Sequence, residues 1–328
     1  MSGSEIPPLV VTPAGTLPAS TGHFGQLRAW LSFHSTAVTV AGSVIVAAAL
    51  VIGLWGKRGD FAAAFGEASL LILGAAVLLQ MIWLIARSEA WHVCVEAAGG
   101  KVTRRRLYRA ASVGYLGNIF NGNFGLAVRI AALRRSAPSD SPRPSVLVAA
   151  EMPILVIEGA LAALMSFTLV GPLGLAWWVP VVAFAVALAL IAGMTRFVRD
   201  RREGFWKGLA VMRGLRGRNA IIGLVIFAVC MQVARNWLVL EGVGVDVSIF
   251  DAVALLIAAA AIGILPVGPS LGVATAVLIL GANGVAVVAA AGALLTATAA
   301  VGALCFAAWA LVDRLRRTPT PAVAAASP

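Results

Sequence analysis

The chain has 328 residues, of which 60% are apolar and 12% are charged, and its mean hydropathy is +0.94. Soluble domains carry about a quarter charged residues, so this composition excludes a soluble globular protein and predicts a polytopic membrane protein. The net charge of +11 does not indicate nucleic-acid binding, because the lysines and arginines form blocks between apolar runs. Anionic lipid headgroups at the cytoplasmic surface are the partners that such blocks attract.

The N-terminal segment, residues 1–36, is rich in Pro, Ser, Thr and Gly and is predicted to be disordered or to lie on the surface. A transmembrane domain is expected over 37–312. Its first apolar run, 37–55, is longer than the core of a signal peptide, which predicts an uncleaved membrane helix. A second membrane helix is expected over 68–85.

Residues 87–109 interleave arginines and a lysine with apolar side chains, a pattern typical of an amphipathic helix on the inner membrane surface. The following stretch, 114–133, is apolar but interrupted, and each of its arms is too short to cross ~30 Å of hydrocarbon. It therefore predicts a re-entrant hairpin, which is stable only where protein or a wet cavity surrounds it. The interrupting residues are Gly117, Asn118, Asn121, Gly122 and Asn123.

Three further runs, 145–170, 173–194 and 220–240, are predicted to span the membrane. The segment 196–218 between the last two holds eight lysines or arginines and two acids, whereas the loop after residue 240 is acidic.

A second interrupted stretch, 258–280, has the same design as the first. A last span over 285–312 precedes a basic and then disordered tail, 313–328. The interrupting residues of this second stretch are Pro266, Gly268, Pro269 and Ser270.

The basic loops decide the predicted topology, because lysine and arginine favour the cytoplasmic side. A full crossing by 114–133 would place the basic segments 134–143 and 196–218 outside. If this stretch enters and leaves from the cytoplasm, both segments stay inside, and the second hairpin must enter from the opposite face. We therefore expect an all-α plasma-membrane protein with six full spans, two oppositely inserted re-entrant hairpins forming an inverted repeat, and both termini in the cytoplasm.

The hairpins are the predicted binding site for a lipid. The N-terminus of a half-helix presents free N–H groups and a positive dipole end, which suit a phosphate. Asn123 and Ser270 are placed either to cap the half-helices or to contact the ligand, and the sequence leaves both roles open. The predicted binding residues are Asn118, Asn121, Gly122, Asn123, Gly125 and Arg129 in the first hairpin and Pro266, Gly268, Ser270 and Gly272 in the second.

Glu151 and Glu158 complete this predicted site, because a charge within an apolar run costs at least ~2.5 kcal/mol. Their spacing of seven places them on one helix face. An ion pair between either glutamate and Arg129 would lower the cost of both charges, with or without a transport role. Pro153 predicts a kink in this helix, and Arg235 is expected to extend to the outer surface.

These residues resemble the flippase-like family that includes the transmembrane region of lysylphosphatidylglycerol synthase, over about residues 30–312. The first family motif is roughly Pro-Gly-Arg-x-Gly-Glu-x-x-Arg preceded by an asparagine. The matching residues are Asn118, Gly122, Gly125 and Arg129, while Asn121, Asn123 and Leu126 stand in place of Pro, Arg and Glu. In the second motif, similar to L-P-x-P-G-G-L-G-x-x-E, the matching residues are Leu265, Pro266, Leu271 and Gly272, and Thr275 replaces the glutamate.

The resemblance implies hairpins that dip from both faces and a lipid that moves between leaflets. The two replaced glutamates imply either a different lipid or an acidic role for Glu151 and Glu158. The expected function is therefore binding or translocation of an anionic or polyprenyl-linked lipid, without enzymatic activity or a cofactor. A polyprenyl diphosphate phosphatase, a non-transporting scaffold for cell-envelope enzymes and a homodimer stay open. The three cysteines and three histidines lack ligand spacing, so no metal site is predicted.

Overall fold

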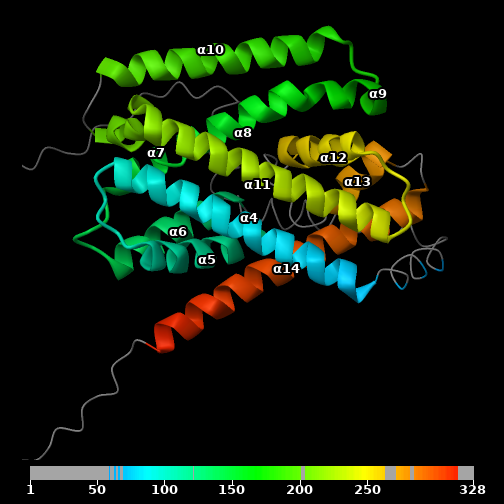
Figure 1. The fold of residues 1–328 in the computed structure, drawn as a ribbon, viewed down its shortest axis with the longest axis horizontal. Coiled ribbons are helices and arrows are strands. Elements are labelled where there is room, and N and C mark those ends of the chain that lie inside the picture. Colours follow the sequence, from blue (N-terminus) through cyan, green and yellow to red (C-terminus); the bar gives the residue numbers. More distant parts are fainter. Residues whose placement is uncertain are drawn as a thin grey trace, which may run out of the picture. The chain divides into compact units, whose positions relative to one another are not determined.

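The computed structural model describes residues 69–120, 122–200, 204–262, 271–280 and 284–316, with the single positions Gly59, Ala63 and Gly66. These residues all belong to one compact unit, 39–328. No strand occurs in the described ranges, so the predicted all-α fold class is confirmed. The helices are α4 (Leu70–Ala97), α5 (Arg104–Phe120), α6 (Gly122–Ser136), α7 (Pro144–Ala149), α8 (Met152–Met165), η2 (Ser166–Leu169), α9 (Val170–Leu173), α10 (Trp178–Asp200), η3 (Gly204–Arg213), α11 (Leu215–Gly242), α12 (Ile249–Ile262), α13 (Leu271–Leu280) and α14 (Val285–Leu315) (Figure 1).

Several helical stretches are long and apolar enough to cross a membrane, which supports an integral membrane protein. They correspond to the second, third, fifth and last predicted spans. The fourth predicted span contains a shorter apolar helix, Trp178–Gly193. The first predicted span, 37–55, lies outside the described residues, as does the segment 1–36, so the count of six stays a prediction. The four long stretches are Leu70–Ala97, Pro144–Leu169, Leu215–Gly242 and Val285–Leu315.

The same order of helices occurs twice. A 28-residue helix, two shorter helices and a long final stretch make up α4–α8, and the same succession makes up α11–α14. Each set supplies most of one apolar core. The two opening helices, α4 and α11, pack against each other in antiparallel directions (Figure 1). Gly242 at the end of α11 lies against Ile72 at the start of α4, and Arg235 contacts Gln80 further along.

The first predicted hairpin is present as the antiparallel pair α5 and α6. The helices approach so closely that a Cβ on Gly125 would lie 2.5 Å from the carbonyl oxygen of Gly114. Glycine at these positions therefore sets the helix separation. In the second predicted hairpin, α12 packs against α13, and the interruption between them lies at 263–270, outside the described residues. The faces from which the hairpins enter a membrane stay a prediction.

The prediction of a separate surface helix over 87–109 is wrong, because residues 104–109 are the first turns of α5. Residues 87–97 are the last turns of α4, and Trp91 and Cys94 are completely buried. The reason is that the apolar members of this segment pack into the core of the first helix set, against α5, α6 and α7. At the predicted kink the helix is interrupted at Ala150 and Glu151, just before Met152 and Pro153.

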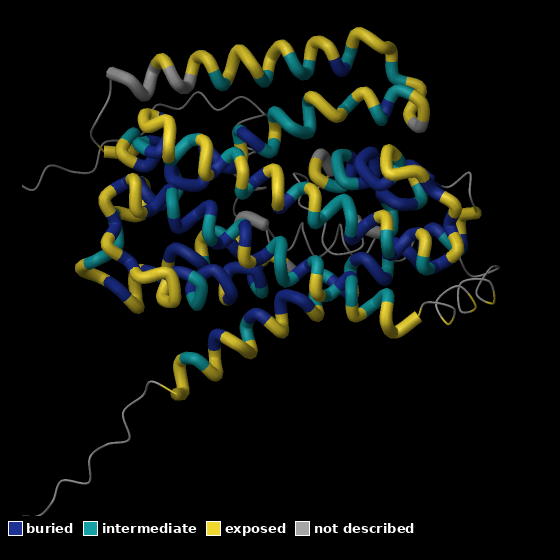
Figure 2. Tube along the Cα trace, viewed as in Figure 1, coloured by how far each residue is buried: buried dark blue, intermediate teal, exposed yellow. Residues whose placement is uncertain are grey.

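Large apolar side chains remain exposed on the outer helices. Figure 2 shows that α10 is exposed over much of its length, where Val186 and Leu190 are 52% and 64% exposed. Leu304 and Leu311 on α14 are similarly exposed. Such extended apolar surfaces are unfavourable in water and are expected where lipid covers the protein.

Candidate functional site: a charged cavity at the first hairpin

A cluster of four charged side chains joins three helices. Arg87 on α4 donates through Nη2 to Glu151 Oε1 at 2.8 Å and through Nη1 to Glu158. Arg129 on α6 donates to the second carboxylate oxygen of Glu151. The predicted pairing of Arg129 with a glutamate is therefore confirmed for Glu151. Glu158 pairs with Arg87, a residue of the segment predicted to lie on the membrane surface.

Local structure explains how both glutamates reach one arginine. Glu151 lies in the interruption between α7 and α8, where Pro153 prevents a continuous helix. Glu158 lies two turns further along α8, on the same side. The planar guanidinium of Arg87 presents two nitrogens side by side and can bind two carboxylates at once, whereas the ammonium group of a lysine is a compact point charge.

The cluster is electrically neutral, with two arginines and two glutamates. The side chains of Arg129 and Glu151 are 7% and 6% exposed, and that of Glu158 is 29% exposed. Buried charges are stable only when each has a partner, because removal from water is costly. Glu151 is the most tightly held acid, since it contacts both arginines, whereas Glu158 is the acid most open to a ligand.

Trp91 and Gly114 fix the position of Arg129. The guanidinium carbon of Arg129 lies 4.1 Å from the ring centroid of Trp91, in a cation–π contact. A Cβ on Gly114 would lie 2.6 Å from the Cβ of Arg129, so any larger residue there would displace the arginine. Arg129 is thus held by a ring, a carboxylate and a close backbone contact.

The cluster faces a cavity of about 330 Å³. Five of the predicted binding residues line it: Asn118, Gly125, Arg129, Glu151 and Glu158. Sequence reasoning missed the other lining residues, which are Trp83, Arg87, Gly114, Tyr115, Leu126 and Leu155. Arg87 carries no sequence signal of its own, because it lies at the boundary between an apolar run and a basic segment.

The packing of the remaining predicted site residues lies outside what the structure describes. Gly122 begins α6 and Gly272 lies in the first turn of α13, but the structure does not describe which residues pack around them. The residues outside the described ranges are Asn121, Pro266, Gly268 and Ser270, and the side chain of Asn123 is not described either.

The expectation that Arg235 extends to the outer surface is wrong. Arg235 is 5% exposed, donates to Gln80 Oε1 and contacts Asn236. It faces α4 because α11 packs along that helix, so the arginine lies between two helices instead of at a free end.

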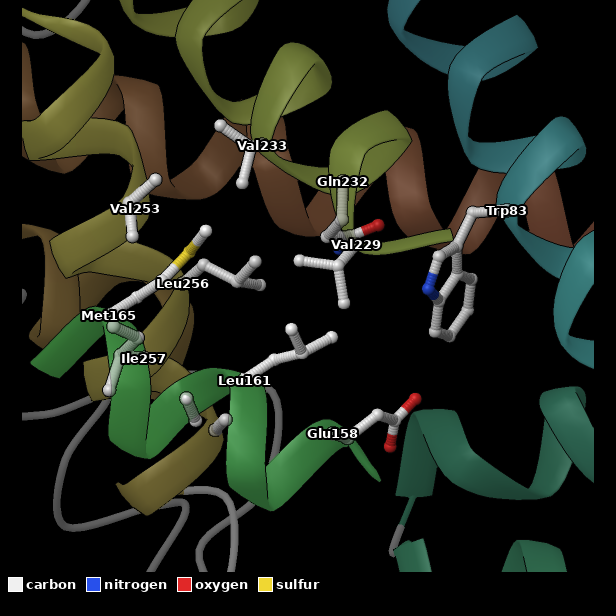
Figure 3. Close-up of a pocket in the computed structure, with 12 residues that line it drawn as sticks. Trp83, Glu158, Leu161, Met165, Val229, Gln232, Val233, Val253, Leu256 and Ile257 are labelled. Carbon is white, nitrogen blue, oxygen red and sulfur yellow. The ribbon is translucent and has the colours of Figure 1, made fainter. Parts of the chain in front are cut away.

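A second cavity, of about 200 Å³, meets the first at Trp83 and Glu158, which line both. Its wall is otherwise apolar except for Gln232 (Figure 3). The side chains come from α8, α11 and α12, with Trp83 from α4.

No group of three or more His, Cys, Asp or Glu side chains suited to a metal ion occurs in the described part of the chain. Comparison of the chain with protein-family profiles, with curated proteins and with solved structures found no match.

Proposed function

We propose that this integral membrane protein binds an anionic or polyprenyl-linked lipid and moves it between the two leaflets. The observation that carries the proposal is the charged cavity beside a helical hairpin, with Arg87 and Arg129 on its wall. A guanidinium group can bind two oxygens of one phosphate at once. The exposed apolar helices of the protein are suited to contact with lipid. The resemblance to the flippase-like family, based on the motif that includes Asn118 and Arg129, supports the same function.

The lipid phosphate enters by exchange of ion-pair partners. Arg87 contacts both glutamates, and Glu158 is its more exposed partner. An incoming phosphate therefore displaces Glu158 from Arg87, while Glu151 keeps Arg87 and Arg129 in place. Because the cluster is neutral without a ligand, its buried charges are all paired in that state. When the Glu158 carboxylate moves away, the Arg87 guanidinium becomes available to the phosphate.

The repeated helix order supports alternating access. Two copies related by an axis in the membrane plane place equivalent helices antiparallel, and α4 and α11 pack in this way. We infer six full spans, two hairpins that enter from opposite faces, and cytoplasmic termini in the plasma membrane. Rocking of one helix set against the other then exposes the cavity to each leaflet in turn.

Leaflet exchange in liposomes tests the proposal. Purified protein is reconstituted with fluorescent phosphatidylglycerol or polyprenyl phosphate, and loss of signal to a membrane-impermeant quencher reports exchange. Wild-type protein should accelerate exchange of at least one lipid, and Arg129→Gln should lower that rate by about ten-fold or more, as expected for loss of a charge-assisted contact. The control is Arg134→Gln, an exposed arginine on the same helix. Exchange no faster than in empty liposomes for both lipids would refute the proposal.

A second candidate function is hydrolysis of a polyprenyl diphosphate. The specific observation in its favour is Arg87, which adds a second guanidinium beside Arg129, because a diphosphate carries charge on two phosphoryl groups. The same reconstituted protein should then release inorganic phosphate from the diphosphate lipid, and Glu158→Ala should abolish that release. Release at the rate of protein-free liposomes would exclude this function.

A further inference from the structure

The two cavities differ in chemistry but share part of their walls. The first is lined by both arginines and both glutamates of the cluster, whereas the second has an apolar wall with Gln232 as its uncharged polar side chain. Trp83 and Glu158 belong to both. Figure 3 shows these two residues facing each other at the edge of the apolar cavity. A charged compartment followed directly by an apolar one matches the two parts of a single amphiphile.

We propose that the apolar cavity holds one hydrocarbon chain of the lipid whose headgroup occupies the charged cavity. This inference rests on the proposed function and adds that the chain lies inside the protein between α8, α11 and α12, with Trp83 at the joint. The shared wall identifies the occupant, because Trp83 and Glu158 line both cavities and bring the apolar cavity next to the one that holds the headgroup.

Gln232 provides a further feature of the ligand. Its Oε1 is buried and has no hydrogen-bond partner among the described residues. A buried polar atom without a partner is destabilising, and a ligand that supplies one gains affinity. Gln232 lies on the wall of the apolar cavity, as does Trp83 at the joint. The side-chain amide of Gln232 therefore offers a hydrogen-bond partner to a hydroxyl or amide group of a ligand in this cavity, as in a lipid built on glycerol or a sphingoid base.

Photo-crosslinking locates the chain. Two probes, phosphatidylglycerol and polyprenyl phosphate with a diazirine in mid-chain, are incorporated in nanodiscs with the full protein, irradiated, and mapped by mass spectrometry. The expected labels are on Leu161 and Met165 of α8 and on Leu256 and Ile257 of α12, which line the apolar cavity. Labels confined to exposed α10 side chains such as Val186 would overturn the inference. Labelling by phosphatidylglycerol but not by polyprenyl phosphate would support the role assigned to Gln232, and the reverse would overturn that role.

A variant that fills the cavity separates this inference from the proposed function. Ala162→Trp places a large ring in the apolar cavity and should lower cavity labelling by about ten-fold or more, as overpacking excludes the chain. The matched control, Ala185→Trp, changes an exposed α10 residue and should label as wild type. Binding of glycerol 3-phosphate, which has no chain, should persist in Ala162→Trp and be lost in Arg129→Gln. Unchanged cavity labelling in a folded Ala162→Trp protein would overturn the inference. Normal leaflet exchange with only α10 labelling would do the same while leaving the proposed function intact.

Discussion

Arg87 and Glu158 form an ion pair although they lie 71 residues apart in the chain. The pair joins α4 to α8, and the other arm of Arg87 binds Glu151, which in turn binds Arg129 on α6. One connected cluster thus ties together α4, α6 and α8, which line the charged cavity together with α5. Its centre is Glu151, with two arginine partners, and its edge is Glu158, with one.

The two glutamates should therefore differ in their contributions to stability. Glu151→Gln leaves two buried arginines with a weakened partner and should cost about 3–5 kcal/mol, the range for breaking a buried ion pair. Glu158→Gln should cost clearly less, because its side chain is 29% exposed and Arg87 retains Glu151. Chemical denaturation in detergent, followed by tryptophan fluorescence, measures both.

The matched control for these variants is Glu241→Gln, an exposed glutamate near the end of α11, which should change stability by no more than about 0.5 kcal/mol. Equal losses for the variants at 151 and 158 would contradict a cluster centred on Glu151. The two variants should differ less in their rates of lipid exchange than in their stabilities, since Glu158 is the residue that a phosphate displaces.

Charge and apolar pattern predicted much of the fold and half of the site. The cost of a charge in an apolar run singled out Arg129, Glu151 and Glu158, and the structure places all three in one cavity. Arg87 was missed because it follows an apolar run and begins a basic one, and sequence alone does not tell a helix end from its continuation. Whether such an arginine reaches water or a buried acid depends on packing between helices distant in the chain.

Arg235 shows the same limit in a second helix. Its place near the end of an apolar run fits a side chain that reaches the surface, but α4 covers that face of α11. The missing information in both cases was which helix face meets which neighbour. The existence of a helix follows from local composition, whereas its end and its pairing depend on the tertiary fold.

Gly125 should be intolerant of even one added methyl group. A Cβ there would lie 2.5 Å from the Gly114 carbonyl oxygen, so Gly125→Ala forces α5 and α6 apart and should destabilise the protein by about 1–3 kcal/mol. Gly223→Ala is the control, because a Cβ at that helical position meets nothing within 4 Å. It should be neutral or stabilise by up to about 1 kcal/mol through helix propensity. If thermal shift assays gave the same sign for both variants, the close approach of the hairpin helices would not be a stability determinant.

The buried contact between Gln80 and Arg235 should show strong coupling. Gln80→Met keeps the shape of the side chain but removes the acceptor for a buried guanidinium, which should cost about 1–3 kcal/mol or more. Arg235→Met removes the charge itself and should cost less. The double variant should be more stable than the sum of the single losses predicts, because neither polar group is then left alone. Additive losses in a double-mutant cycle, within about 0.5 kcal/mol, would show that the two side chains act independently.

Trp91 should stabilise the protein through the cation–π contact of its ring face with Arg129 as well as through the core volume that it fills. Both Trp91→Phe and Trp91→Leu leave space in the core, but only phenylalanine keeps an aromatic face toward the guanidinium. The leucine variant should therefore be less stable than the phenylalanine variant, by up to about 2 kcal/mol for a desolvated cation–π contact. Repeating the comparison in an Arg129→Gln background supplies the control, since the cation is then absent and the difference between phenylalanine and leucine should shrink. A difference that persists unchanged would assign the effect to packing alone. Because Arg129 is also the proposed phosphate ligand, Trp91→Leu should lower lipid exchange more than Trp91→Phe does in the same reconstituted assay.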